Sequence, residues 1–304
     1  MDLINTFLNL TAPPFTFVSL CLLLPPFQIL KFILSIFASF YPEDVFGKVV
    51  LITGASSGIG EHLAYEYAKR GACLVLSARR EGSLREVADL CLEMGAPDAI
   101  VVSGDVAKVE DCRRIIDATI SRYGRLDHLV NNAGVVGVNQ FDELEDVTRM
   151  RPVMASKAAM LAFFETLRVE LGSDVKITIV TPGVIESEFT KGKVWTEGGM
   201  KVDQELRDVQ VNVIPVGTVE GTAKSIIRSV CRGDRYVTTP AWFKVTYFLK
   251  MLCPEVLEWA YRFLFLTSTD DSPTGAMGKH MVDFPGAKAM LYPPGIQSSD
   301  VKTD

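Results

Sequence analysis

Charged residues are missing from the start of this chain. None occurs between Leu3 and Leu30, and an uncharged stretch of that length can in principle cross the hydrocarbon core of a membrane. The chain begins Met1-Asp2, without the basic residues of a secretory signal, and no small-residue cleavage site follows. We therefore expect residues 1–45 to be retained as an anchor in a membrane or a lipid droplet.

Basic runs and paired cysteines are missing too. Lys and Arg number 31 against 37 Asp and Glu, and no cluster of basic residues is dense enough to follow a phosphate backbone. The 6 cysteines are scattered and form no CxxC pair, a distribution that indicates reduced thiols and not a disulfide framework or a zinc site. These absences argue against a nucleic-acid partner and against a bound metal.

Prolines interrupt the uncharged segment. Pro13-Pro14 and Pro25-Pro26 bracket the stretch Phe15–Leu24. Proline pairs break or kink a helix, and the freed backbone groups must be satisfied inside the apolar phase, so we expect a bent or hairpin anchor that could sit in a lipid monolayer. An ordinary single-pass anchor in the endoplasmic reticulum is the alternative. Lys31 and Lys48 follow the uncharged segment, which favours a cytoplasmic position for the rest of the chain.

An α/β domain is predicted between residues 46 and 235, where apolar runs alternate with helical patterns. We expect strands at Val49–Thr53, Ala72–Ala78, Ala99–Ser103, Leu126–Val130 and Val175–Val180, and helices at Glu61–Arg70 and Lys157–Leu171. In the loop after the first strand, Gly54 allows a tight turn, Gly58 lets the backbone approach a pyrophosphate, and Gly60 permits close packing of helix on strand. The following helix N-terminus would offer its free N–H groups to phosphates. This loop predicts a dinucleotide-binding site.

The choice of cofactor is read at the end of the second strand, where the chain has Ser77-Ala78-Arg79-Arg80. A site that prefers NAD places Asp or Glu there to accept hydrogen bonds from the ribose hydroxyl. A guanidinium group suits a 2′-phosphate instead, so we expect NADP(H). The alternative is that the two arginines are ordinary solvated surface charges.

The string Thr53–Gly60 and the later string Asn131-Asn132-Ala133-Gly134 together resemble those of the short-chain dehydrogenase/reductase superfamily. The resemblance implies a Rossmann-type doubly wound parallel sheet, with Asp105-Val106 facing the adenine and Ser187 near the nicotinamide carboxamide. The implied cofactor-binding residues are Gly54, Ser56, Ser57, Gly58, Ile59, Gly60, Arg79, Arg80, Asp105, Val106, Asn132, Ala133, Gly134, Lys157, Pro182, Gly183 and Ser187. His128 lies in an apolar strand, and we expect it to be a core residue.

The catalytic tyrosine of that superfamily has no counterpart here. It stands four residues before a lysine, and the matching stretch reads Val153-Met154-Ala155-Ser156-Lys157. Only 23 positions separate Gly134 from Lys157, where the pattern needs roughly 65, so about 40 to 45 residues are absent, including the strand that carries the catalytic serine. Phe141–Val147 resembles the start of a helix whose remainder is missing. Either the next strand moves over by one place, or residues near 145–171 form one fused helix kinked at Pro152.

The chemistry explains why this loss matters. In the superfamily the tyrosine hydroxyl is the general acid or base on the substrate oxygen, the lysine lowers its pKa and binds the ribose, and the serine steadies the substrate. Lys157 is the one catalytic residue retained, and a valine at position 153 cannot exchange a proton. Without the acid–base contribution, turnover falls about 10²- to 10⁴-fold, so we expect an impaired or inactive enzyme. The family's dimer helices are also affected, so its oligomeric state is not carried over.

A closer resemblance is to the plant steroleosins, or 11β-hydroxysteroid dehydrogenase-like proteins. It rests on the proline-bracketed anchor, the NADP-type domain and the aromatic-rich segment 236–304, and it implies sterol-type substrates and residence on oil bodies or the endoplasmic reticulum. The aromatic stretches Pro240–Phe243 and Trp259–Leu266 could form helices that cap an apolar pocket or touch a membrane, or an ordinary packed subdomain. We expect a substrate lid at Glu186–Gly217 and a polar frayed tail from Pro293.

Three functions remain open from the sequence. The chain is a membrane-anchored hydroxysteroid dehydrogenase with some turnover, a non-catalytic lipid-droplet protein that binds NADPH or sterol, or an unstable splice product.

Overall fold

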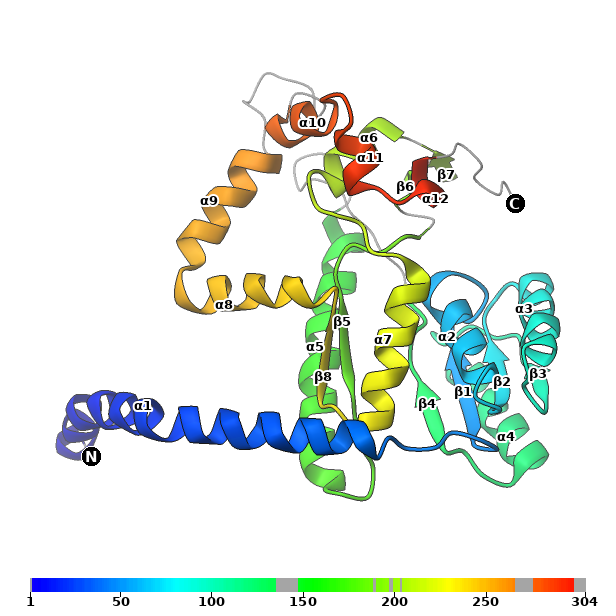
Figure 1. Cartoon of the computed structure of the whole chain (residues 1–304), viewed down its shortest axis with the longest axis horizontal. Helices are drawn as coiled ribbons and strands as arrows, with labels where there is room; N and C mark the ends of the chain where they lie inside the picture. Colours follow the sequence, from blue (N-terminus) through cyan, green and yellow to red (C-terminus); the bar gives the residue numbers. More distant parts are fainter. Residues whose placement is uncertain are drawn as a thin grey trace. The chain divides into compact units, whose positions relative to one another are not determined.

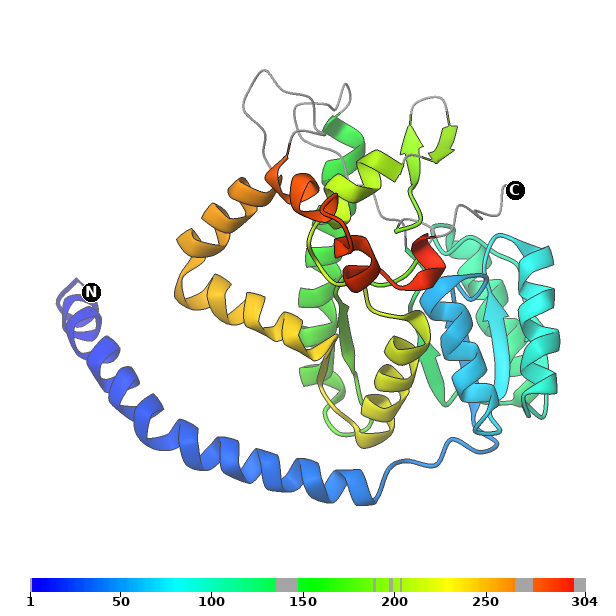
Figure 2. The ribbon, with the colours of Figure 1, turned by 45° about the horizontal axis from the view of Figure 1, so that its top comes forward.

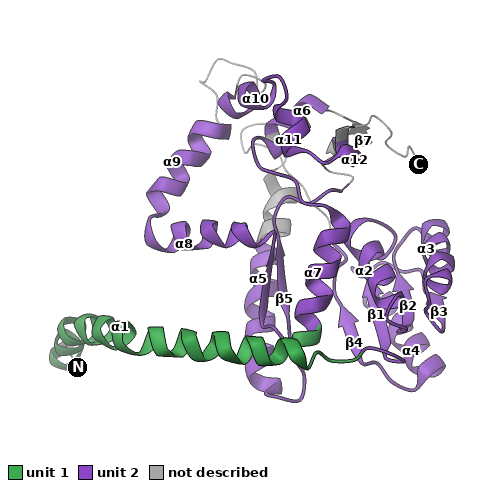
Figure 3. Cartoon of the chain, in the orientation of Figure 1, with its two compact units in different colours: residues 1–44, 231–233 green, residues 45–230, 234–304 purple. Residues whose placement is uncertain are grey.

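A computed structural model of the chain describes residues 2–134, 147–187, 190–196, 199–202, 204–265 and 276–297. The chain divides into two compact units (Figure 3). The first consists of residues 1–44 and 231–233, and the second of residues 45–230 and 234–304. Each unit is described below by itself.

The first unit is dominated by one helix, α1 (Asp2–Phe40), which contains Pro13, Pro14, Pro25 and Pro26. It is the one helix in the described part of the chain that is long and apolar enough to cross a membrane, with a mean hydropathy of 2.0 over its best window. Of the two expected forms, the hairpin is wrong for this structure and the bent helix is observed: α1 is one helix that contains the prolines and curves without reversing (Figure 2). At 1.5 Å per residue it is about 58 Å long, more than a hydrocarbon core of about 30 Å requires.

The second unit contains a four-stranded parallel sheet in the order β3-β2-β1-β4 (Figure 1). Its strands are β1 (Val49–Thr53), β2 (Cys73–Ser77), β3 (Ala99–Val101) and β4 (His128–Val130), and the connecting helices are α2 (Gly58–Ala68), α3 (Glu81–Glu93) and α4 (Val109–Tyr123). All five residues of β1 are buried, as a continuous apolar run predicts for a parallel strand covered on both faces. Ile115 of α4 packs on Val49, Leu51 and Val75. The four strands predicted here from the sequence are thus confirmed, with small differences at their ends.

The sheet stops at β4 in the described residues. The next strand, β5 (Ile179–Pro182), pairs in parallel with β8 (Tyr236–Thr239) in a separate two-stranded sheet. Between β4 and β5 the chain forms one helix, α5 (Val147–Leu171), which includes Pro152. The fused helix is therefore observed and the shifted strand is not, whereas Phe141–Asp146, where a helix start was expected, lies outside the described residues. Because the described residues between β4 and β5 contain no strand, nothing bridges β5 to the first sheet.

The strand expected at Val175–Val180 begins four residues late, at Ile179. Its partner decides this: Ile179 N donates to Arg235 O at 3.0 Å, and the Thr178 hydroxyl donates to Asp234 O at 2.7 Å. A pairing with residues 57 positions further along the chain cannot be read from local pattern.

The remaining elements of the second unit lie before and after β8 in the sequence, and residues 204–216 pack with residues 277–297 in a small lobe. They are β6 (Lys193–Thr196), β7 (Gly199–Val202), α6 (Gln204–Val211), α7 (Val219–Arg232), η2 (Ala241–Phe243), α8 (Lys244–Leu252), α9 (Pro254–Phe265), α10 (Met277–Val282), α11 (Ala287–Leu291) and α12 (Pro294–Gln297). The segment expected to be a lid, Glu186–Gly217, contains β6, β7 and α6.

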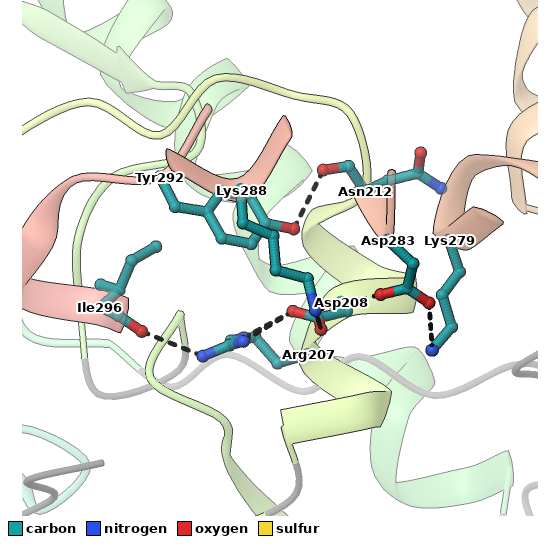
Figure 4. A network of polar contacts seen from close by, with 8 residues as sticks. All are labelled: Arg207, Asp208, Asn212, Lys279, Asp283, Lys288, Tyr292 and Ile296. Atoms are coloured by element: carbon teal, nitrogen blue, oxygen red, sulfur yellow. Dashed lines mark hydrogen bonds and ion pairs between the residues drawn. The ribbon is translucent and has the colours of Figure 1, made fainter. Parts of the chain in front are cut away.

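A buried polar network fastens α6 to the chain's C-terminal part (Figure 4). The Arg207 guanidinium donates to Asp208 Oδ1 at 2.7 and 2.9 Å and to Ile296 O at 3.0 Å, and Lys288 Nζ donates to Asp208 Oδ2 at 2.7 Å. Tyr292 and Ile296 are buried against Val211 of α6. The frayed tail expected from Pro293 is thus wrong up to Gln297, because apolar side chains at 292 and 296 pack inside the lobe.

Candidate functional site

The glycine loop after β1 has the geometry that requires glycine. Gly54 and Gly58 have φ angles of +68° and +62°, in the region that side chains disfavour. A Cβ on Gly54 would lie 2.8 Å from Ala133 Cα, and a Cβ on Gly60 would collide with Gly54 O. Helix α2 starts at Gly58 and includes Ile59, and Ser57 before it makes no side-chain cap. The first N–H groups of α2 are therefore available to an anion.

The loop after β4 is fastened to the loop after β1. Asn132 Nδ2 donates to Thr53 O at 3.2 Å and to Gly54 O at 3.1 Å. The Thr53 hydroxyl accepts the N–H groups of Asn132 and Ala133 at 3.1 and 3.2 Å. Sequence reasoning identified Asn132 but missed Thr53, whose signal is a hydroxyl at the carboxyl end of an otherwise apolar strand. Together they hold the glycine loop against the end of β4.

The arginines after β2 lie at the same edge of the sheet. Arg80 Nη2 donates to Ser57 Oγ at 2.9 Å and reaches Ser56 Oγ at 3.5 Å. The guanidinium of Arg80 therefore lies against the glycine loop. A purely solvated arginine would have no protein partner such as Ser57. Arg79 is held through its backbone, since its carbonyl accepts from the Ser103 hydroxyl at 3.5 Å.

Asp105 and Val106 follow β3 at this edge as well. The Asp105 carboxylate accepts the N–H of Ala107 at 3.0 Å, and its own N–H donates to Asp111 at 2.9 Å. Arg114 donates to Asp111 and holds the pKa of that carboxyl below its usual range. Val106 is left 44% exposed, so an apolar surface stands free beside the loop.

Lys157 reaches this edge from α5. Its Nζ lies 2.9 Å from the position that a Cβ on Gly134 would take. Val153 comes four residues before Lys157 in the sequence of the same helix. The ammonium group thus stands next to Gly134, which follows the end of β4.

Five of the chain's 8 tyrosines use their hydroxyls in bonds away from the glycine loop. They bond to other partners at Tyr65 (Glu61), Tyr67 (His128), Tyr123 (Asp98), Tyr236 (Glu165) and Tyr292 (Asn212). Burial, and then neighbouring carboxylates, raise the pKa of Tyr65, Tyr123 and Tyr292 above the ordinary value. An acid–base tyrosine needs a lowered pKa, so these three do not replace the missing one. His128 contacts the buried Tyr67, which fits the structural role expected for it.

The remaining predicted residues follow β5 and are not joined to the first group by strand pairing. Gly183 N donates to Thr239 O at 2.8 Å, and the ring of Phe243 occupies the space where a Cβ on Gly183 would lie. Ser187 makes a local turn in which its N–H donates to Thr190 Oγ1 at 2.7 Å. Sequence reasoning missed Phe243, which no local pattern pairs with Gly183.

A parallel sheet, a glycine loop that leads into a helix, and polar residues gathered at the carboxyl ends of β1 to β4 define a dinucleotide-binding α/β protein. Residues 48–155 match the family model of the short chain dehydrogenases. The fold is similar to that of L-sorbose reductase from Gluconobacter frateurii, solved with NADPH and L-sorbose, with a TM-score of 0.54 and 23% identity over 65% of this chain and 97% of that one.

Closer relatives are found among curated plant proteins. The chain is 51% identical to 11-beta-hydroxysteroid dehydrogenase A of Sesamum indicum and 50% identical to 11-beta-hydroxysteroid dehydrogenase 1A of Arabidopsis thaliana, with all of each chain covered. This chain therefore belongs to the 11-beta-hydroxysteroid dehydrogenase family of short-chain dehydrogenases, which use NAD(P)H. The alignment to the sesame protein has 348 positions, so at least 44 of them hold no residue of this 304-residue chain.

Proposed function

We propose that this chain is a membrane-anchored, NADP(H)-binding member of its family whose own oxidoreductase turnover is impaired or absent. The observation that carries the proposal is helix α5, which runs unbroken from Val147 to Leu171 where the family pattern has a strand, a serine and a tyrosine. The strands and loops of the cofactor half come before this helix in the chain. The helix itself contains no tyrosine that could act as the acid–base group.

The residues around the glycine loop fit a dinucleotide. A Cβ on Gly60 would fill the loop, the N-terminus of α2 is uncapped by a side chain, and Arg80 stands over Ser57. In this proposal the α2 amides bind the pyrophosphate, and Arg79 and Arg80 bind the 2′-phosphate. Asp105 and Val106 contact the adenine side, and Lys157 binds the nicotinamide ribose beside Gly134. Pro182, Gly183 and Ser187 would contact the carboxamide only if β5 takes its place beside β4.

The missing groups limit what the bound cofactor can do. NADP(H), when bound, supplies or accepts a hydride, but a carbonyl or alcohol oxygen also needs a proton donor or acceptor. Val153 offers neither, and loss of a positioned acid or base lowers turnover by about 10²- to 10⁴-fold. The 44 or more unmatched positions in the alignment support a deletion, and the interrupted sheet is what a deletion after β4 would produce.

The membrane part of the proposal rests on α1. No residue of its most apolar window is buried, and an exposed apolar helix of this length is stable in lipid and not in water. We place it in the endoplasmic reticulum or on lipid droplets, with the second unit in the cytoplasm. Substrates of the steroid or sterol type follow from the names of the relatives.

A second candidate is an enzyme that keeps measurable turnover. The position of Lys157 beside Gly134 favours it, because one of the catalytic residues is already in place. In that case water would exchange the proton at the substrate oxygen, at a reduced rate.

Thermal unfolding of the full chain in detergent, with NADPH or NADH, tests cofactor binding. We expect NADPH to raise the midpoint more than NADH, because a ligand stabilises the state that binds it. A chain with a cooperative transition and no shift by either cofactor would contradict the proposal.

Turnover of Val153→Tyr separates the two candidates. If the proton donor is the only defect, the variant gains about 10²- to 10⁴-fold in reduction of a steroid ketone. If the interrupted sheet also prevents the substrate from lying over the cofactor, as we expect, the variant gains nothing while binding NADPH like the parent.

A further inference from the structure

Helix α5 is fastened to the β5–β8 sheet by one arginine. Arg168 lies in the last turn of α5, and its Nε donates to Ile177 O at 3.2 Å while its Nη2 donates to Arg235 O at 3.1 Å. The guanidinium carbon lies 4.8 Å from the centre of the Tyr236 ring. The Tyr236 hydroxyl in turn donates to Glu165 of α5 at 2.8 Å. We call Glu165, Arg168 and Tyr236 together the α5 clamp.

The α5 clamp is more specific than an ordinary surface contact. Arg168 is half-buried and uses two different N–H groups on two carbonyl oxygens, so its planar guanidinium is held in one orientation. The aromatic ring beneath the cation adds a further attraction. Arg235 O also accepts the N–H of Ile179, so the guanidinium bonds to the first rung of the β5–β8 pairing. The clamp therefore holds the last turns of α5 to the start of this sheet.

The same helix also reaches the cofactor edge of the first sheet. Lys157 Nζ lies 2.9 Å from the position that a Cβ on Gly134 would take, directly after β4. Among the described residues no strand joins the first sheet to the β5–β8 sheet. Helix α5, which runs alongside β5 and β8 in Figure 1, thus links the two sheets in place of strand pairing.

The helix and the strand that leave the clamp extend over similar lengths. Lys157 comes 11 residues before Arg168, which is about 16 Å along a helix at 1.5 Å per residue. Gly183 comes four residues after Ile179, which is about 13 Å along a strand at 3.3 Å per residue. Because the chain reverses between α5 and β5, both segments extend from the clamp toward the same end of the sheet (Figure 1). Lys157 and the turn Pro182-Gly183 are therefore brought to about the same level.

We propose that Arg168, with Tyr236 and Glu165, is a positioning residue for the nicotinamide half of the cofactor site. It holds α5, and with it Lys157, in place relative to the turn Pro182-Gly183. The inference rests on the cofactor binding proposed above and divides that site into two separable halves. The adenine and the 2′-phosphate need only the elements from β1 to β4, whereas the nicotinamide ribose needs the α5 clamp as well.

Two ligands separate these halves in calorimetric titrations of the full chain in detergent. NADPH occupies both, and adenosine 2′,5′-bisphosphate carries the adenine and the 2′-phosphate but no nicotinamide. The bond from the Lys157 ammonium to the ribose should alone make NADPH bind about 10- to 150-fold more tightly than the bisphosphate. Arg168→Met removes the guanidinium, so the Kd for NADPH should rise about tenfold or more while the Kd for the bisphosphate stays unchanged.

The chain offers a matched control for this variant. Arg122 of α4 lies over Tyr123 and bonds to Asp98 at 2.8 and 3.0 Å, the same grouping of arginine, tyrosine and carboxylate. Asp98 precedes β3 and therefore lies at the amino end of the sheet, opposite the cofactor edge. Arg122→Met should leave both Kd values unchanged.

A conservative variant keeps the test available if Arg168→Met does not fold, which thermal unfolding would show. Arg168→Lys keeps the charge and the stem, but one ammonium group does not reproduce the fork that bonds to Ile177 O and Arg235 O. This variant should lose part of the preference for NADPH over the bisphosphate.

A double variant shows whether Arg168 acts through Lys157. If it does, Lys157→Met/Arg168→Met should bind NADPH with a Kd close to that of Lys157→Met, because an ammonium that is already removed cannot also be misplaced. Independent contributions of the two side chains would instead multiply in the Kd.

Three results would overturn the inference and leave cofactor binding intact. In the first, Arg168→Met weakens NADPH and the bisphosphate equally, so the arginine supports only the fold. In the second, the effects of Lys157→Met and Arg168→Met multiply. In the third, the parent chain binds both ligands with the same Kd, so the nicotinamide half contributes nothing. A parent chain that binds neither ligand would overturn the cofactor proposal together with the inference.

Discussion

Replacing Arg80 by alanine removes the guanidinium that stands over Ser57 Oγ at 2.9 Å. If this group binds a 2′-phosphate, NADPH loses a hydrogen bond to a charged partner while NADH loses none. Such a bond contributes about 1.5–3 kcal/mol. At about 1.4 kcal/mol per tenfold, the Kd for NADPH should rise about 10- to 150-fold.

The fold should tolerate this change. Arg80 stands at the N-terminal boundary of α3 without capping it through its side chain, so alanine removes no helix cap. Arg85→Ala is the matched control: Arg85 lies on the same helix, is 72% exposed and pairs with Glu81 at 2.6 Å. An exposed pair of this kind contributes little to stability, and its loss should leave both cofactors bound as before.

Calorimetric titration of the full chain in detergent, at low and at moderate salt, measures both Kd values. We expect the NADPH preference of the parent to shrink with salt, because screening weakens exposed charge pairs, and to be much smaller in Arg80→Ala, where only Arg79 is left. Equal weakening of NADPH and NADH, or an unchanged Kd for NADPH, would refute the assignment of the 2′-phosphate site.

Three further predictions concern the second unit. Gly60→Ala should destabilise the chain by about 1–3 kcal/mol in urea unfolding and remove the NADPH-induced shift, because the new Cβ meets Gly54 O. Gly82→Ala, with open space around it, should be neutral or stabilising by about 0.4–1 kcal/mol, and equal effects of the two variants would contradict the role given to the glycine loop. Burial raises the pKa of Glu66, but hydrogen bonds from Arg70 and Lys69 outweigh burial, so the net pKa is lowered. The contribution of Glu66 to the free energy of unfolding should therefore be present above the unfolded pKa of about 4.3 and be lost as the pH falls through the folded value. The urea midpoint of Glu66→Gln should lack this acid-dependent loss. Desolvation lowers the pKa of Lys288, but bonds to Asp208 and Asp283 raise it overall. The contribution of Lys288 to the free energy of unfolding should therefore be full below about pH 10.4 and be lost as the pH rises through the folded value. Lys288→Met should increase amide exchange at Tyr292 and Ile296, and unchanged protection would argue against the network as what holds this segment.

The cofactor half could be predicted from the sequence because its constraints are local. Gly54 and Gly58 need positive φ, and the apolar run Val49–Ile52 needs burial on both faces, so a short string determines strand, turn and helix. The position of Arg80 over Ser57 was accessible for the same reason: both follow neighbouring parallel strands, whose carboxyl ends meet.

The back half could be predicted less well because its constraints are distant. The start of β5 depends on Asp234 and Arg235, and the exclusion of a side chain at Gly183 depends on Phe243. The packing of Ile296 on α6 depends on the buried pair Arg207–Asp208, which reads as a surface pair in the sequence. Pro13 and Pro25 led to the expectation of a hairpin, although proline disfavours a helix interior without forbidding one.

The interruption between β4 and β5 also affects the fate of the polypeptide in a cell. Each strand has one edge without a strand partner among the described residues, and Leu129 in the middle of β4 is 50% exposed. Open strand edges with apolar side chains are templates for association with other chains, and they are what chaperones and proteases encounter. How much of this protein accumulates would then depend on how long those edges stay open after synthesis.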